Sequence, residues 1–248
     1  MINKSNFTWI DAIIIVLKKH NNIATLKMLH QEAPKIYSNY NFISGKTPFK
    51  TINERVQRDK RITKLAPGLY TLTEKINELP KEYNPKLQTK SEKEGLNHIS
   101  IQSLLLQLGQ IYGFETYTPD KSKKIISKTL GDFATIEKYP QFTYDRIVKR
   151  VKMIDVTWFN ARKFPINLFE IEHSSDMKNA LSKFMELMDF KTRMTIVAPE
   201  IRENEFYKIM EQPSFKPILS QTIFYSYAKV EKLYNSEKEI HSLRTLII

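Results

Sequence analysis

The chain of 248 residues contains no cysteine. Disulfide bonds, thiolate zinc sites and a cysteine nucleophile are therefore excluded. There are only 6 glycines, and neither a GxxxxGK[ST] loop nor a GxGxxG motif is present, so ATP-driven translocation and dinucleotide binding are not expected within this chain. With 41% hydrophobic and 27% charged residues, the composition is that of a globular protein and excludes a disordered or collagen-like chain.

Long apolar runs are also missing. The longest, such as residues 12–17 and 104–106, fall far short of the roughly 20 residues that a transmembrane helix needs. The first residues show no cationic stretch followed by a long apolar core and a small-residue cleavage site, which a signal peptide requires. We therefore expect no membrane partner.

Positive charge is in excess and unevenly distributed. The formal net charge is +12, from 39 Lys and Arg against 27 Asp and Glu. Residues 1–75 carry 13 basic and 5 acidic side chains, whereas residues 98–248 carry 22 and 18. A surplus of this size indicates a polyanionic partner. The distribution predicts a small basic module that targets DNA, joined to a larger and nearly neutral module with a second activity.

A linker is predicted between the two modules. Residues 76–97 contain Pro80, Pro85 and Gly95, and no apolar periodicity of 3.6 or 2 survives there. The predicted organisation is a DNA-binding domain over 1–75, a linker over 76–97 and a second domain over 98–248.

The first module has the pattern of a winged helix. Thr8 and Asp11 have the spacing of a capping box at the start of a first helix. A second helix is expected over residues 24–33, ending before the next proline, and Thr47-Pro48 is a strong start for a third. A Pro67-Gly68 turn between short apolar runs follows. Three helices and a small hairpin predict a winged helix-turn-helix domain.

The third helix of this module is the predicted DNA-facing element. Phe49, Ile52 and Val56 share one apolar face, and polar or basic side chains occupy the rest. The candidate DNA-contacting residues on and around it are Lys46, Lys50, Thr51, Asn53, Gln57, Arg58, Lys60 and Arg61. A polar helix face is also what a merely solvated surface shows, but the basic surplus of this module favours nucleic acid.

Three stretches of this module resemble a known family. They read FTWIDAIIIVLKKHNNIATLKMLHQEA, SGKTPFKTINERVQRD and APGLYTLTE. They resemble the HARE-HTH domain, a winged helix-turn-helix found on chromatin proteins and restriction endonucleases. The resemblance covers about residues 5–75, and its most telling elements are Trp9-Ile10-Asp11-Ala12, Thr47-Pro48 and Gly68-Leu69-Tyr70. It implies DNA binding, with a link to modified DNA, through the helix from Pro48 to about Arg58.

The second module has an α/β pattern. Apolar residues recur at spacings of three and four over residues 98–113, which predicts an amphipathic helix. Two strands are expected over 151–159 and 166–173, joined by a turn, and residues 120–150 stay unassigned. The remaining predictions are strands at 114–117, 194–198 and 221–227 and helices at 176–190 and 202–210. This order of helices and strands predicts an α/β layered fold.

Acidic residues stand within these two apolar strands. Asp155 lies in the first, and Glu170 and Glu172 flank Ile171 in the second. Alternation puts Glu170 and Glu172 on one face of their strand, about 7 Å apart, with His173 on the other face. Pairing the strands as a hairpin brings Asp155 to the same patch.

Three converging carboxylates are typical of a site for a hard divalent cation such as Mg²⁺. We expect one or two Mg²⁺ ions per active site, with Asp155 and Glu170 as metal ligands and Asp155, Glu170 and Glu172 as catalytic residues. The alternative is that these acids lie on an exposed edge and form salt bridges with Lys152, Arg162 or Lys163.

The placement of these acids resembles the PD-(D/E)xK nuclease superfamily, the fold of many restriction enzymes, over about residues 94–200. Asp155 matches the acidic residue of the first motif strand, and Glu170-Ile171-Glu172 matches the (D/E)xK segment. Two positions depart from the common motif. Ile154 replaces its proline, and Glu172 stands where lysine is usual, as in the E-x-E variant.

These departures leave two assignments open. Water would be activated either by Glu172 through a metal or by a lysine from elsewhere, such as Lys152. The superfamily often adds an acidic or polar residue from the preceding helix, and the candidates in and around that helix are His98, Gln102, Glu94 and Glu115.

These features predict a Mg²⁺-dependent type II restriction endonuclease of the prokaryotic cytoplasm that hydrolyses phosphodiester bonds in double-stranded DNA. A cognate DNA methyltransferase is expected to be encoded nearby, without a stable complex. The alternatives are a modification-dependent or repair nuclease and a non-catalytic DNA-binding regulatory protein.

One catalytic centre cuts one strand, so a homodimer is expected at least on DNA. The C-terminal stretch offers apolar surface for such an interface, at Ile223, Phe224, Tyr225, Tyr227, Leu243, Leu246, Ile247 and Ile248.

Overall fold

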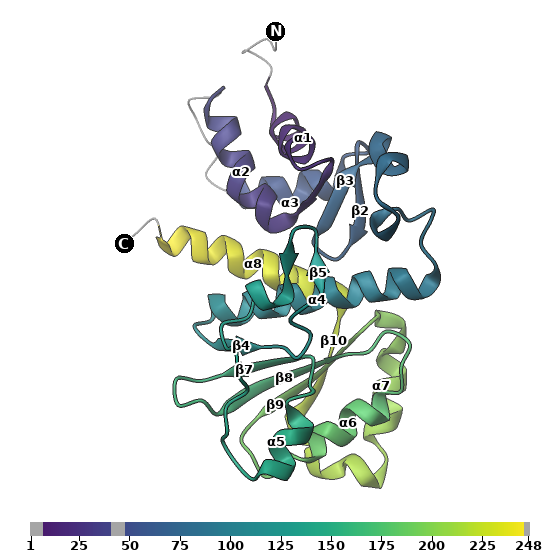
Figure 1. Cartoon of the computed structure of the whole chain (residues 1–248), viewed down its shortest axis with the longest axis vertical. Helices are drawn as coiled ribbons and strands as arrows, with labels where there is room; N and C mark the ends of the chain where they lie inside the picture. The colour runs from purple at the N-terminus through teal and green to yellow at the C-terminus, as the bar shows by residue number, and fades with distance from the viewer. Residues whose placement is uncertain (1–6, 41–47, 246–248) are drawn as a thin grey trace. The chain divides into compact units, whose positions relative to one another are not determined.

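Two helices carry the chain across the boundary between its two compact units. The computed structural model describes residues 7–40 and 48–245. Unit 1 comprises the described residues up to Ser100 and those from Asn235 onward, and unit 2 comprises Ile101–Tyr234. The boundaries fall inside helices α4 (Lys90–Ile111) and α8 (Tyr227–Thr245). Figure 1 shows both helices as continuous ribbons.

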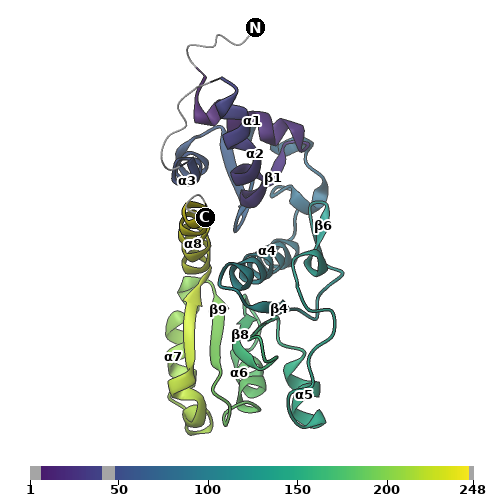
Figure 2. The ribbon, with the colours of Figure 1, turned by 90° about the vertical axis from the view of Figure 1, so that its left-hand side faces the viewer.

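Unit 1 pairs a group of helices with a small antiparallel sheet. Its elements are α1 (Trp9–Lys19), β1 (Ile23–Thr25), α2 (Leu26–Ser38), α3 (Pro48–Arg58), β2 (Ile62–Ala66) and β3 (Leu69–Leu72). The strand order is β1-β3-β2, and both pairings are antiparallel. Figure 2 shows α1 and α2 side by side, and their apolar faces meet α3 in one buried cluster. The predicted capping box is confirmed, because the backbone N–H of Thr8 donates to the Asp11 carboxylate at 2.9 Å.

The predicted bounds of the second helix were wrong at both ends. Ala24 lies in strand β1, opposite Tyr70, and α2 begins at Leu26 with Thr25 as its N-cap. The helix also continues through Pro34 to Ser38. Proline removes one backbone hydrogen bond, but side chains beyond it, including Ile36, still pack against the core of unit 1. Tertiary packing therefore outweighs the local signal for a helix end.

A histidine is buried between α2 and α3. His30 is 2% exposed; its Nε2 and the Oδ1 of Asn53 lie 2.8 Å apart, and the Phe49 ring meets it edge-on. Burial lowers the pKa of His30 from 6.5 to about 4, because the charged imidazolium would lose its hydration; the Lys238 charge acts in the same direction. The folded state thus holds a neutral imidazole at neutral pH.

This histidine makes the chain acid-sensitive. The pKa of His30 is lower in the folded state than in the unfolded state. The free energy of unfolding is therefore at its full value above pH 6.5 and decreases as the pH falls toward 4. The full loss amounts to about 3 kcal/mol. We expect His30→Gln to flatten the dependence of the melting temperature on pH between 7 and 4.5. Parallel curves for His30→Gln and the wild type in circular-dichroism melts would contradict this assignment.

Unit 2 is built on a mixed sheet of five strands in the order β10-β9-β8-β7-β4. The bounds are β4 (Glu115–Tyr117), β7 (Val156–Phe159), β8 (Pro165–Ile171), β9 (Arg193–Ala198) and β10 (Thr222–Ser226). β7 and β8 form the predicted antiparallel hairpin, with Val156 opposite Phe169, whereas β8, β9 and β10 run parallel. The α/β expectation is thereby confirmed.

Helices cover the two faces of this sheet unequally. In Figure 1, α5 (Asp145–Val151), α6 (Met177–Met185) and α7 (Glu203–Met210) lie on one side, and α4 and α8 lie on the other. Side chains from α5, α6 and α7 pack with the sheet into one large buried cluster. Among the described helices, none is long and apolar enough to cross a membrane.

Two predicted segments differ from the structure. The strand expected from residue 151 begins only at Val156, because α5 continues to Val151 and buries Val148 and Val151. The stretch predicted as a linker contains a helical start, since α4 begins at Lys90. It also contains buried side chains such as Leu79 and Tyr83 and the short 3-10 helices Thr73–Glu78 and Lys81–Tyr83. The unassigned residues 120–150 hold a hairpin of β5 (Lys124–Ile125) and β6 (Lys128–Thr129), the 3-10 turn Leu130–Asp132 and α5.

Helix α4 approaches the sheet closely at one glycine. A Cβ added to Gly109 would lie 2.8 Å from Nε1 of Trp158, and closer still to Cγ2 of Thr116. The Nε1 donates at 3.0 Å to the backbone oxygen of Leu105, one turn earlier on α4. The missing side chain therefore allows the indole of β7 to reach the helix backbone.

Two glycines of the same helix should respond in opposite ways to alanine. Gly109→Ala overpacks the contact with Trp158 and should cost about 1–3 kcal/mol. Gly95→Ala meets nothing within 4 Å and should stabilise α4 by roughly 0.5–1 kcal/mol through helix propensity alone. Thermal melts of the two variants beside the wild type test both signs. A Gly109→Ala variant as stable as Gly95→Ala would contradict the close approach.

Candidate active site

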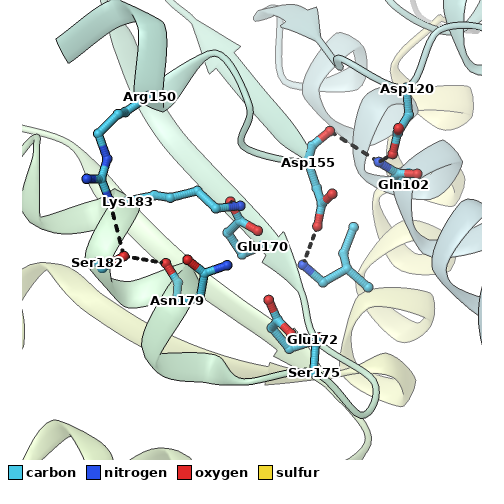
Figure 3. Close-up of polar contacts among 11 residues, drawn as sticks. Gln102, Asp120, Arg150, Asp155, Glu170, Glu172, Ser175, Asn179, Ser182 and Lys183 are labelled. Atoms are coloured by element: carbon cyan, nitrogen blue, oxygen red, sulfur yellow. Dashed lines mark hydrogen bonds and ion pairs between the residues drawn. The ribbon is translucent and has the colours of Figure 1, made fainter. Parts of the chain in front are cut away.

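Asp155 links the two strands of the hairpin beside the paired residues Val156 and Phe169. It directly precedes β7, and its Oδ2 accepts a hydrogen bond from the backbone N–H of Ile171 at 2.8 Å. Figure 3 shows this bond at the end of β8, with the Asp155 side chain turned toward the acids of that strand. The carboxylate is therefore held in place by the backbone of the neighbouring strand.

Glu170 is the most deeply buried acid of the group. It lies on the central strand β8, is 2% exposed, and its Oε1 accepts from the Nζ of Lys183 at 2.6 Å. Burial raises the pKa of Glu170 well above its usual range, and the nearby charges of Asp155 and Glu172 act in the same direction. Lys183 opposes this rise without cancelling it. The cluster thus holds more negative charge than its lysine neutralises.

Glu172 follows β8 and is 7% exposed. Its carboxylate accepts a hydrogen bond from the hydroxyl of Ser175. Arg202 fixes the turn between them, because its guanidinium donates to the backbone oxygens of Glu172 at 3.2 Å and Ser175 at 2.9 Å. The same guanidinium pairs with Glu205 at 2.8 Å. Arg202 therefore positions Glu172 through its backbone.

A fourth acid joins the cluster from the segment after β4. Nε2 of Gln102, on α4, donates to Oδ2 of Asp120 at 2.9 Å and lies 3.4 Å from the backbone oxygen of Asp155. The ligand atoms of Asp120 and Asp155 lie within 4.8 Å of each other. Lys123 pairs with Asp120 at 2.8 Å. Figure 3 shows Gln102 between the two aspartates.

The structure shows where the candidate residues of the sequence lie. Gln102 donates to the Asp120 carboxylate and to the backbone oxygen of Asp155, and His98 precedes it by one helical turn. Glu115 pairs instead with Lys163, at the end of β7 that is remote from Asp155. The acids of β8 do not lie on an exposed edge, because β8 is the central strand.

The cation that pairs with Glu170 is Lys183, whereas Lys152 is an exposed residue just after α5. Sequence reasoning missed Lys183, Asp120 and Arg202. Lys183 lies 13 residues after Glu170 on a helix with an ordinary amphipathic pattern, so nothing local distinguishes it from a solvated lysine.

The donor set of this cluster suits a hard divalent cation. Asp120, Asp155, Glu170 and Glu172 supply carboxylate oxygens, which Mg²⁺ prefers in proteins. Burial and the charges of Asp155 and Glu172 raise the pKa of Glu170, and additional positive charge beside it would act in the opposite direction, as Lys183 does. Among these acids, Asp120 and Asp155 have ligand atoms within 4.8 Å of each other and could share such an ion, and Glu170 is near enough to interact with the Asp155 charge.

The predicted DNA-contacting residues fall into three groups. Lys50, Gln57, Arg58 and Lys60 are exposed on α3 and just after it. Arg61 is exposed but held by two bonds to the carboxylate of Asp59. Asn53 instead contacts His30 between the helices, and Thr51 is half-buried. Lys46 and the predicted cap Thr47 lie outside the described residues.

The apolar residues expected at a dimer interface differ in how far they are exposed. Ile223 is 39% exposed, whereas Phe224 is buried in the core of unit 2 because it points to the opposite face of β10. Tyr225 and Tyr227 are half-buried. The structure does not describe the side chain of Leu243, and residues 246–248 lie outside the described range.

Comparison with known proteins identifies a relative and a family of this chain. A type II restriction enzyme, NmeDI of Neisseria meningitidis serogroup C, is 28% identical over 150 residues, which cover 56% of this chain and 42% of that protein. The chain thus spans less than half the length of this relative. No solved structure matches the chain. The family model described as the type II restriction enzyme NmeDI C-terminal domain matches residues 78–248 and takes in every acid of the cluster. The chain therefore belongs to the type II restriction enzyme NmeDI C-terminal domain family.

Proposed function

We propose that this protein is a Mg²⁺-dependent type II restriction endonuclease that hydrolyses phosphodiester bonds in double-stranded DNA. The observation that carries the proposal is the group of Asp155, Glu170 and Glu172, in which the buried Glu170 carboxylate is paired with the half-buried Lys183 and also lies near the charges of the other two acids. Family membership over residues 78–248 supports it. The net charge of +12 suits a polyanionic substrate.

Two finer assignments belong to this proposal. Unit 2 would be a PD-(D/E)xK nuclease fold of the E-x-E variant, supported by the order helix α4, hairpin β7–β8 with its acids, helix α6 and parallel strand β9. Unit 1 would be a winged helix-turn-helix domain of the HARE-HTH type, supported by the order α1, β1, α2, α3, β2, β3 and by its antiparallel sheet. In this arrangement α3 would face DNA and the β2–β3 hairpin would be the wing.

Each residue of the cluster has a proposed role. Asp155 and Glu170, with Asp120 beside them, would hold one or two Mg²⁺ ions, which when bound supply Lewis-acid stabilisation of charge on the phosphate. Asp155 keeps its ligand geometry through the N–H of Ile171. Lys183 sets the orientation of the Glu170 carboxylate, and its ammonium can donate to a water beside that carboxylate. Glu172 would accept or orient the proton of that water.

The partners follow from the chemistry. The substrate would be double-stranded DNA, with phosphate contacts from Lys50, Arg58 and Lys60. A homodimer on DNA would place two such clusters on the two strands. A methyltransferase encoded nearby would protect host DNA without forming a stable complex, and the protein would act in the prokaryotic cytoplasm.

Removal of either metal-binding carboxylate should abolish cleavage. Asp155→Ala and Glu170→Ala should leave plasmid DNA uncut with Mg²⁺ present, at least about 100-fold below wild type. Both variants should bind DNA as well as the wild type, or better, because a carboxylate that repels phosphate has gone. The assay uses methylated and unmethylated plasmid, with binding measured by gel shift in EDTA.

Asp189→Ala is the matched control, since Asp189 is exposed on unit 2 outside the cluster. It should cut at the wild-type rate. Near wild-type cleavage by Asp155→Ala or Glu170→Ala would refute the site. Nicked rather than linear product throughout would argue against concerted cleavage by a dimer.

Replacement of Lys183 should lower both the maximal rate and the Mg²⁺ concentration that the reaction requires. Lys183→Met removes the cation beside Glu170, so the maximal rate should fall about 100-fold. The Mg²⁺ concentration at half-maximal rate should fall too, because the acids lose a competing positive charge. Lys183→Arg should recover part of the rate. Lys178→Met, an exposed lysine on the same helix, is the control; equal behaviour of the two Met variants would exclude this role.

A further inference from the structure

A cavity of about 700 Å³ lies on the face of the unit 2 sheet that is opposite Glu170. All of its lining residues belong to unit 2 and come from α4, α8, the sheet and the segments that lead into its strands. Alternation along β8 puts Asn167 and Phe169 in this cavity and turns Leu168 and Glu170 to the other face. The cavity is therefore distinct from the acidic cluster, and its size is typical of a small-molecule site.

Aromatic rings form much of its wall, and they are held in fixed positions. The indole of Trp158 is anchored through Nε1 to the backbone of α4. The Phe114 ring lies nearly parallel to it, with centroids 5.8 Å apart, and the Phe169 ring centroid is 4.7 Å away. Tyr112 and Tyr225 also line the cavity. Rigid aromatic faces of this kind favour a flat aromatic ligand, which can stack on them.

The wall also contains an unused hydrogen-bond acceptor. Nε2 of Gln221 donates at 2.8 Å to the backbone oxygen of Met188, which fixes which end of the amide is oxygen. Oε1 of Gln221 is buried and has no hydrogen-bond partner among the residues that the structure describes. A purely hydrocarbon ligand would leave this acceptor unsatisfied, whereas a ligand with an N–H donor would satisfy it.

The charged side chains that line the cavity are all positive. Lys191 and Arg193, at the start of β9, line it and are exposed, and the lining contains no acidic residue. Neither side chain is paired with a carboxylate among the described residues. A ligand of this cavity is therefore expected to be an anion as well as an aromatic ring with an N–H donor.

We propose that this cavity binds a nucleotide. The base would stack on the aromatic wall at Trp158 and donate an N–H to Oε1 of Gln221, and the phosphate would lie against Lys191 and Arg193. The nucleotide would be either free or one unit of a DNA strand turned out of its stack, because both sources present the same base and phosphate. This inference does not depend on the proposed nuclease activity.

The two tryptophans of the chain, Trp9 and Trp158, allow a direct test. In Trp9→Phe, Trp158 is the sole fluorescent indole, and stacking of a base should quench it. The four deoxynucleoside monophosphates and a single-stranded oligonucleotide are titrated in EDTA, which prevents cleavage. Saturable quenching by a monophosphate would identify a free nucleotide as the ligand of the cavity. Quenching by the oligonucleotide but by none of the monophosphates would identify the ligand as a nucleotide within DNA. Deoxyadenosine should bind at least 10-fold more weakly than its monophosphate.

Variants in the Trp9→Phe background identify the residues responsible. Gln221→Leu and the double variant Lys191→Gln, Arg193→Gln should each weaken binding at least 10-fold. Lys216→Gln, an exposed lysine outside the lining, should leave it unchanged. Absence of quenching by every probe would overturn the proposal, as would equal affinity in the charge variant. A third result would also overturn the proposal. If no nucleotide binds, and sedimentation shows a concentration-dependent dimer that Ile223→Glu dissociates, the cavity would instead be the binding surface for a second copy of the chain.

Discussion

A carboxylate on the central strand of a sheet costs free energy unless its charge is compensated, and Glu170 of β8 is compensated only in part. Lys183 lies 2.6 Å from it, but Asp155 and Glu172 add negative charge on the same side. An ordinary core position would carry an apolar residue here, since burial of an ionised group is otherwise strongly unfavourable. The surrounding structure holds this unfavourable charge in place, and a bound divalent cation would relieve it.

The scaffold keeps these acids together through backbone contacts as much as through side chains. The Asp155 carboxylate accepts a hydrogen bond from a backbone N–H of β8. Arg202 donates to the backbone oxygens of Glu172 and Ser175, at the two ends of the turn that follows β8. Both anchors use backbone groups, which fix the positions of the two acids. A site built in this way is arranged before any ligand arrives, which is the condition for electrostatic stabilisation in catalysis.

The sequence allowed the hairpin and its acids to be predicted because that information is local. Alternation alone places Glu170 and Glu172 on one face of β8, and the apolar runs around Asp155 mark the paired segment. Lys183, Asp120 and Arg202 were not predictable, because each reaches the cluster through the packing of a separate element. Local signals also misled where packing was stronger, as at Pro34 within α2 and at Val151, which closes a helix instead of opening a strand.

Strand β8 has no side that faces only solvent. Leu168 and Glu170 face the core beneath α6 and the acidic cluster, whereas Asn167 and Phe169 line the aromatic cavity on the reverse face. The two proposed binding surfaces thus share the backbone of one strand, so any shift of β8 that a ligand produced on one face would also move the residues of the other face. Thermodynamic reciprocity then applies: whatever factor a ligand of the cavity imposes on cation affinity at the acids, the cation imposes on the ligand.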